Sequence, residues 1–186
     1  MHSRDPALAP LHCLMSFSQA VHVRRMVAKI TVDPKQTFWI LVVNTLLSTA
    51  AVEWSKVFGS RSEQTHWTHR IPEGEQPAIR DALLQQLTMT PDQWSEYRKT
   101  IVDYRDQLVA HHDLNATPKY IPKYDHALVA ADFMFTELRG RADQDWLGRI
   151  PVNLDEWARG VAGNMSAIVR KAFTASADLG SNVPSH

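Results

Sequence analysis

The sequence predicts an all-α protein, a single-domain bundle of five or six helices. Apolar residues recur with the helical period in several segments, which indicates helices with one buried face. Helix start and stop signals separate these segments, and no stretch shows the alternation typical of a half-buried strand. A chain of 186 residues, 44% of them apolar, is long enough to bury one core. We expect the domain over residues 16–178, between a loose N-terminal leader (residues 1–15) and a disordered tail (residues 179–186).

Two helices are predicted before residue 60. The first spans Phe17–Ile30. The second begins near Asp33–Pro34, because proline suits the first turn of a helix, and it ends at Gly59–Ser60, because glycine often follows a helix end. Its apolar run, Phe38–Val52, is shorter than the roughly 20 residues that span a bilayer. We therefore expect this run to form a buried core helix.

A polar loop, residues 60–74, precedes the third and fourth predicted helices. The third helix spans Pro77–Leu87. Thr90 then marks the clearest helix start, because threonine suits the N-cap, proline follows it, and Gln93 can complete a capping box. The fourth helix should run from there to about His111. Its expected apolar stripe contains Trp94, Tyr97, Ile101, Tyr104 and Leu108, and an adjoining stripe contains Arg98, Arg105 and His112.

Two more helices are predicted after residue 124. The fifth spans Asp125–Arg139, and residues 140–152 are expected to form a loop because they contain two glycines and a proline. A second capping box starts the last helix, with Asn153 as the N-cap and Glu156 as its return partner. This helix should end near Ala177.

Composition and charge limit the classes of partner. Twenty basic and twenty acidic residues cancel, which argues against a broad positive surface for DNA or an anionic membrane, so neither is an expected partner. This balance still allows a compact cleft that acts on one RNA bond. The single cysteine, Cys13, excludes an internal disulfide and a cysteine-based zinc site. We expect a soluble, cytoplasmic protein.

The stretch Tyr104–Asp113 holds the candidate site, at the expected C-terminal end of the fourth helix. Arg105 and His112 lie two turns apart on nearly one face, roughly 10 Å along the axis. His111 lies roughly 120° from that face in an ideal helix, so it can join Arg105 only if the helix ends or loosens there. The candidate catalytic residues are Arg105, Asp106, His111 and His112.

This stretch resembles the signature of the HEPN superfamily, an arginine and a histidine separated by four to six residues in small helical domains. The spacer has five residues if the histidine is His111 and six if it is His112. Asp106 also fits, because the position after the arginine is commonly Asn, Asp or His in that family. A second stretch, Glu53–Ser60 with Thr65–Trp67, resembles a segment of uncharacterised proteins of abortive-infection type. The resemblance covers roughly residues 35–175.

The resemblance implies a HEPN-like bundle that acts as a metal-independent endoribonuclease, a hydrolase of toxin or abortive-infection type in antiviral defence. Arg105 would bind the phosphate, His111 would move protons, and Asp106 would orient them; His112 is the reserve candidate. Arginine suits a phosphate because its planar fork binds two oxygens, and histidine titrates near neutral pH. The implied partners are RNA and a second copy of the chain, with an antitoxin or regulatory partner also allowed. No cofactor and no metal are implied.

One feature departs from part of the family. Some toxins that are paired with a nucleotidyltransferase antitoxin carry a tyrosine two residues after the histidine. In this chain the position is Asp113 if counted from His111, or Leu114 if counted from His112. The sequence therefore gives no support to control by modification of that tyrosine.

Three alternatives remain open at the level of the sequence. Arg105 and Asp106 could form only surface ion pairs, and histidines are favoured at a helix C-terminus by the dipole. The domain could instead be a non-catalytic HEPN-like module that binds RNA, a nucleotide or a protein. A metal-dependent hydrolase could use a histidine cluster, whose candidate ligands are His66, His69, His111, His112, Asp113 and His126. A simpler explanation than metal binding for His66 and Trp67 is that they pack their loop onto the bundle. The aromatic residues Trp54, Phe58 and Trp67 could also belong to a dimer face.

Overall fold

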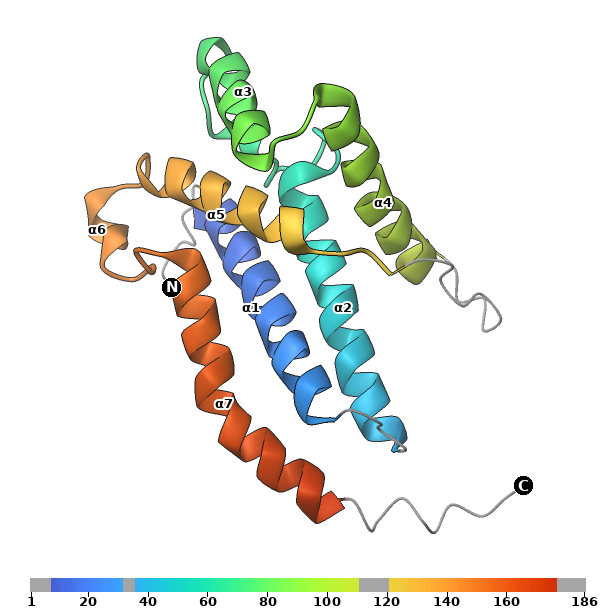
Figure 1. Ribbon diagram of the computed structural model, residues 1–186. Helices are drawn as coiled ribbons and strands as arrows, with labels where there is room; N and C mark the ends of the chain where they lie inside the picture. The colour runs from blue at the N-terminus through green and yellow to red at the C-terminus, as the bar shows by residue number, and fades with distance from the viewer. Residues whose placement is uncertain (1–7, 32–35, 111–120, 177–186) are drawn as a thin grey trace.

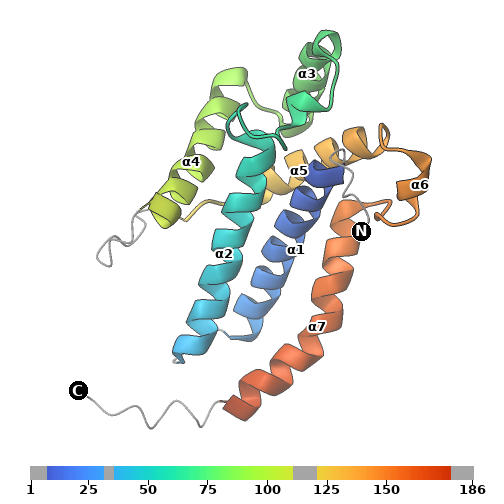
Figure 2. The same cartoon turned by 180° about the vertical axis from the view of Figure 1, so that it is seen from behind.

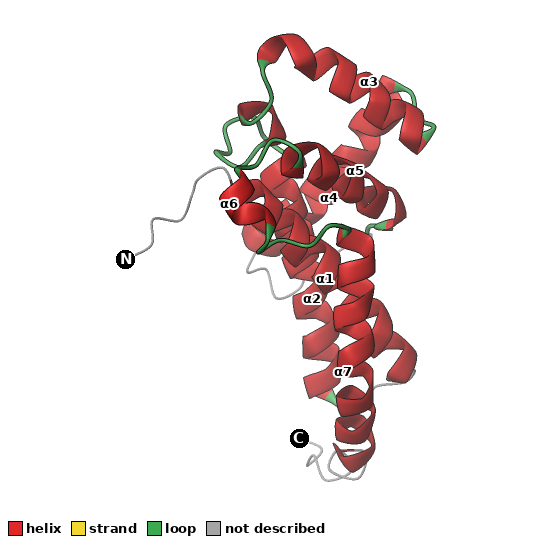
Figure 3. Cartoon of the chain, turned by 90° about the vertical axis from the view of Figure 1, so that its left-hand side faces the viewer, coloured by secondary structure: helices red, strands yellow, loops and turns green. Residues whose placement is uncertain are grey.

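The computed structural model describes residues 8–31, 36–110 and 121–176, and these residues form an all-α bundle without strands (Figure 3). Six helices have twelve or more residues and one, α6, has four. The helices are α1 Ala9–Ile30, α2 Thr37–Phe58, α3 Gln76–Leu87, α4 Pro91–Ala110, α5 Asp125–Arg139, α6 Gln144–Leu147 and α7 Leu154–Ser176. The predicted fold class, an all-α single-domain bundle, is confirmed.

Three long helices form the body of the bundle. Helices α1, α2 and α7 run side by side, with α1 between the other two (Figures 1 and 2). Helix α5 crosses the bundle near the C-terminal end of α2, α3 lies beyond that end, and α4 runs alongside the C-terminal half of α2 (Figure 1). Helix α4, which carries the candidate residues Arg105 and Asp106, packs against α2.

The N-terminal helix is longer than the sequence predicted. Helix α1 begins at Ala9 instead of Phe17, so the leader expected over residues 1–15 is wrong from residue 8 onward. Pro10 lies in its first turn, where a missing N–H costs nothing, and Leu11 and Leu14 are completely buried. Residues 1–7 lie outside the described part of the chain, and so does the tail expected over residues 179–186.

Helix α2 ends as predicted but is not buried throughout. Its last turn stops at Gly59, whose N–H donates to the carbonyl of Ser55 over 2.8 Å. A Cβ atom at Gly59 would lie 2.4 Å from that carbonyl oxygen, so only glycine fits there. One side of its N-terminal half is exposed, with Phe38 60% and Leu41 61% accessible although Trp39 is buried, which corrects the expectation of a buried core helix over Phe38–Val52. By length and composition α2 is also the one helix of the described chain that could cross a membrane, although it is only weakly apolar.

The helix starts predicted from capping signals agree with the structure. Thr90 and Gln93 exchange two hydrogen bonds, of 2.9 and 3.2 Å, at the start of α4, so the first capping box is complete. Asn153 accepts a 2.8 Å hydrogen bond from the N–H of Glu156 at the start of α7. The ends of α5 are the predicted ones. The loop expected over residues 140–152 contains the short α6.

An aromatic cluster joins α2 to α4 inside the main core. The ring of Trp54 lies 4.8 Å from that of Phe58 and 5.9 Å from that of Trp94, measured between centroids. Trp54 and Phe58 are completely buried and Trp67 is 7% accessible. The idea that Trp54, Phe58 and Trp67 belong to a dimer face is therefore wrong, because their rings are already covered within the chain.

Candidate functional site

Arg105 and Asp106 form a local pair near the C-terminal end of α4. Nε and Nη2 of Arg105 lie 2.8 and 2.7 Å from the same carboxylate oxygen, Oδ1 of Asp106. The Arg105 side chain is 23% accessible and that of Asp106 is 56% accessible. The neighbouring Tyr104 is buried against the core and holds this part of α4 in place. Asp106 thus fixes one edge of the guanidinium, and among the described residues it is the only partner recorded for the Arg105 side chain.

The histidines of the candidate site cannot be placed beside this pair. His111 and His112 lie outside the described residues, as does Asp113. The structure therefore brings together Arg105 and Asp106 and leaves the choice between His111 and His112 as a prediction. The described part of α4 runs to Ala110, so the predicted helix end near His111 lies outside the described residues and stays a prediction.

Arg98 has a role that the sequence did not reveal. Two turns before Arg105, its Nε donates to the carbonyl of Phe58 over 2.7 Å and its Nη2 to that of Gly59 over 2.8 Å. These carbonyls lie at the C-terminal end of α2, where the helix leaves acceptors without partners and the dipole is negative. The only signal in the sequence was the spacing of seven between Arg98 and Arg105, and spacing could not show that α2 ends at this point.

His66 and His69 are occupied by contacts within their own loop. Nδ1 of His66 lies 2.7 Å from the Thr68 hydroxyl, and Nε2 of His69 lies 2.7 Å from the Arg61 carbonyl. The His66 ring is buried and stacks on Trp67, so the expected packing of this loop on the bundle is confirmed. Burial, together with the positive charge of Arg98, lowers the pKa of His66 to about 4.

The described residues give no support to the histidine-cluster metal site. Within them, no group of three or more His, Cys, Asp and Glu side chains is arranged so that it could hold a metal ion. The rings of His66 and His69 are 6.3 Å apart, and the His126 ring packs edge-on against Tyr97. The other proposed ligands, His111, His112 and Asp113, lie outside the described residues.

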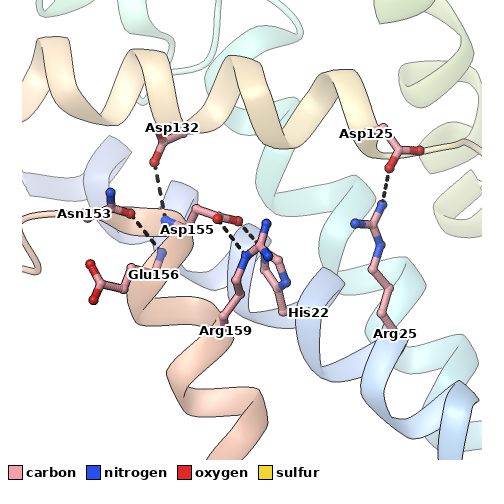
Figure 4. A network of polar contacts seen from close by, with 8 residues as sticks. All are labelled: His22, Arg25, Asp125, Asp132, Asn153, Asp155, Glu156 and Arg159. Carbon is pink, nitrogen blue, oxygen red and sulfur yellow. Dashed lines mark hydrogen bonds and ion pairs between the residues drawn. The ribbon is translucent and has the colours of Figure 1, made fainter.

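A second polar cluster, at the start of α7, was also missed (Figure 4). Oδ1 of Asp155 lies 3.0 Å from Nε2 of His22 on α1, and Oδ2 lies 2.7 Å from Nε of Arg159. The N–H of Asp155 donates to Asp132 of α5 over 3.3 Å, and Arg25 pairs with Asp125 nearby. This network ties three helices together. Burial lowers the pKa of His22 and outweighs the opposing effect of Asp155, so the ring stays largely neutral.

Fold and geometry define the protein as an all-α helical bundle in which Asp106 orients the side chain of Arg105 near the end of α4. The chain matches no family model, no curated protein and no solved structure. The likeness to the HEPN superfamily therefore stays a prediction from the residues of α4 and its neighbouring stretch.

Proposed function

We propose that the chain is a metal-independent endoribonuclease of HEPN type, acting in toxin or abortive-infection defence. Its site would be built from Arg105, Asp106 and His111 of two subunits, with His112 as the alternative histidine. The protein would act in the cytoplasm, where RNA is its substrate. An antitoxin or another regulatory partner would be compatible with this activity.

The observation that carries the proposal is the guanidinium of Arg105, which Asp106 holds in place and which remains partly accessible. Asp106 accepts from Nε and Nη2, so the side chain is oriented before any substrate binds. An arginine has five N–H donors, and no described residue binds those on the far side of the Arg105 fork, so they could contact phosphate oxygens. A charge that is already positioned stabilises a transition state without the cost of reorganisation.

The proposed reaction uses the RNA's own nucleophile. The 2′-hydroxyl oxygen attacks the adjacent phosphorus as its proton passes to a base, and the P–O5′ bond breaks as the leaving oxygen gains a proton. The products are a 2′,3′-cyclic phosphate and a free 5′-hydroxyl. Histidine suits both proton transfers, because its ordinary pKa of about 6.5 lies close to working pH. Arg105 would stabilise the negative charge that grows on the phosphate oxygens.

The proposed homodimer is supported by apolar surface on α2. Phe38, Ile40 and Leu41 are 60%, 45% and 61% accessible, on the part of the N-terminal half of α2 that the described residues leave exposed. Exposed apolar residues that lie close together are typical of protein interfaces. Two copies of the arginine–histidine pair would also supply the separate groups that accept and donate a proton in one reaction.

The test is RNA cleavage by the purified full chain in excess EDTA. We expect the wild-type protein to produce cyclic-phosphate ends, and Arg105→Ala and His111→Ala to lose at least 100-fold in rate while their circular dichroism is unchanged. Lys99→Ala is the matched control, because it removes an exposed cation from the same helix, and it should cut normally. His112→Ala shows which histidine acts.

Two results would contradict the proposal. Loss of cutting on chelation would point to a metal-dependent reaction. Cutting by Arg105→Ala at the wild-type rate would show that the activity comes from another site or from a contaminant.

A further inference from the structure

A cavity of about 260 Å³ lies between the end of α2, the loop that follows it, α3 and the start of α4. These elements meet at the end of the bundle where α3 and α4 lie (Figure 1). The cavity is distinct from the Arg105 site, since its contribution from α4 comes from the first half of that helix. Its lining residues are Phe58, Arg61, His66, Trp67, Thr68, Arg80, Leu83, Leu84, Pro91, Trp94, Ser95 and Arg98.

The charge of this lining has one sign. It contains Arg61, Arg80 and Arg98, from three different elements, and no aspartate or glutamate. The three guanidinium groups are close enough that Arg61 and Arg80, after burial, lower the pKa of Arg98. Within the described chain, none of the three forms an ion pair with a carboxylate. Like charges that converge on a cavity destabilise the empty protein and are neutralised when an anion binds.

Arg98 is held in place before any ligand arrives. Its two hydrogen bonds to the carbonyls of Phe58 and Gly59 use Nε and one N–H of Nη2. Three of the five guanidinium N–H groups remain, a number sufficient for a two-point contact with an anion. The capping of α2 explains the position of Arg98. It does not explain why Arg61 and Arg80 line the same cavity.

His66 adds a neutral donor to the wall. The ring is 3% accessible, and the N–H of Thr68 donates to its Nδ1. A ring that accepts at Nδ1 and is neutral carries its proton on Nε2, so this nitrogen can donate to a ligand. Burial beside Arg98 keeps the pKa of His66 at about 4, which makes the neutral form the stable one near pH 7.

The rest of the wall is aromatic and aliphatic. Trp67 and Trp94 line the cavity together with Phe58, and two leucines of α3 complete the apolar part. Ligand pockets commonly combine such a wall with a few placed polar groups, and those for drug-sized molecules measure about 300–1,000 Å³. A cavity of about 260 Å³ therefore suits a small ligand, or one end of a larger one. An anion that carries a flat ring could bind both the arginines and the aromatic side chains of the lining.

We propose that this cavity binds a nucleotide through its terminal phosphate monoester, with the phosphate on Arg61, Arg80 and Arg98 and the base against the aromatic wall. A phosphate monoester carries a charge of about −1.5 to −2 at neutral pH and three acceptor oxygens, which matches three cations better than a singly charged carboxylate does. The nucleotide is either free or the phosphorylated end of an RNA chain. The inference does not depend on the ribonuclease proposal, because it uses none of the residues of that site.

The test is calorimetric titration of the full chain with AMP, GMP, CMP and UMP, with adenosine and inorganic phosphate as partial ligands. We expect at least one mononucleotide to bind, adenosine not to bind, and phosphate to bind at least tenfold more weakly. Arg61→Gln and Arg80→Gln should each weaken binding about tenfold or more. They should leave the melting temperature of the free protein unchanged or higher, because each removes a repulsive charge.

Arg170→Gln is the matched control, since it removes an exposed arginine from α7, far along the chain from the cavity lining. It should bind the nucleotide normally. A 5′-phosphorylated RNA oligonucleotide and its 5′-hydroxyl form separate the two sources. Tight binding of the phosphorylated oligonucleotide alone identifies an RNA end, whereas exclusion of both, with mononucleotide still bound, identifies a free nucleotide.

Three results would overturn the inference: no heat with any mononucleotide at millimolar concentration, equal binding by Arg61→Gln and wild type, or equal binding of adenosine and AMP. RNA cleavage is measured separately, with Arg105→Ala. Failure of the ribonuclease proposal and failure of this one are thus distinguishable.

Discussion

Nε of Arg98 on α4 donates a 2.7 Å hydrogen bond to the carbonyl oxygen of Phe58, and Nη2 reaches the next carbonyl, that of Gly59. A side chain from one helix thus completes the hydrogen bonding at the end of another. It also fixes the distance between the end of α2 and the start of α4, where the aromatic cluster and the cationic cavity both lie. Stability and the proposed binding site depend on the same contact.

Removal of this contact should destabilise the protein. Arg98→Ala leaves two carbonyls at the end of α2 without their charged donor, and hydrogen bonds to charged groups contribute about 1.5–3 kcal/mol each. Two such bonds amount to about 3–6 kcal/mol, and relief of the repulsion from Arg61 and Arg80 offsets part of this. We therefore expect the free energy of unfolding to fall by about 2–4 kcal/mol in urea denaturation. Lys99→Ala on the exposed side of α4 is the control and should change it by less than about 0.5 kcal/mol. An Arg98→Ala protein as stable as wild type would show that water replaces the guanidinium.

His66 should make the protein less stable in acid. Its pKa is about 4 in the folded chain and about 6.5 when unfolded, so the unfolded state takes up the proton first as pH falls. The stabilising contribution is complete above pH 6.5 and is lost between pH 6.5 and 4, to a total of roughly 3 kcal/mol. Urea denaturation at several pH values measures it. His66→Asn should flatten this dependence. The exposed His69→Asn should leave most of it in place, because burial of His66 is the largest cause and the charge of His69 a smaller one.

Two glycines should respond to alanine with opposite signs. Gly59→Ala puts a Cβ 2.4 Å from the Ser55 carbonyl oxygen, which forces the end of α2 to move and should cost more than about 1 kcal/mol. Gly160 lies inside α7 with nothing within 4 Å of an added Cβ, so Gly160→Ala should stabilise by about 0.5–1 kcal/mol. Thermal unfolding of both variants checks the pair. A stabilising Gly59→Ala would contradict the close approach.

Asp155 should control both the junction of α7 with α1 and the titration of His22. Asp155→Asn removes the negative charge 3.0 Å from Nε2 of His22, so the pKa of His22, already lowered by burial, should fall further. Because the carboxylate is 38% accessible, the loss of stability should be no more than about 1 kcal/mol. NMR titration of the His22 ring measures the pKa. Asp125→Asn is the control: it removes an exposed carboxylate that pairs with Arg25, and it should leave the pKa of His22 almost unchanged.

Local signals in the sequence predicted most of the helices. The capping box at Thr90 and the glycine at the end of α2 are decided by residues within a few positions of each other, so their consequences are visible without the fold. The structure places the start of α1 at Ala9, inside the segment expected to be a leader, because a proline in the first turn, here Pro10, is well tolerated. The exposed side of α2 was misjudged because apolarity alone does not say which faces the other helices cover.

Part of the candidate site could likewise be predicted from the sequence, and part could not. The sequence by itself determined that Arg105 is followed directly by a carboxylate in a helical segment. It did not determine that the two side chains pair, because neighbouring positions on a helix are about 100° apart and do not face each other. Only the tertiary structure decided that Arg98 caps α2, that Asp155 meets His22, and that Arg61, Arg80 and Arg98 converge on one cavity. Those contacts join residues from separate helices and loops. Helix packing sets their distances, and no local pattern encodes packing.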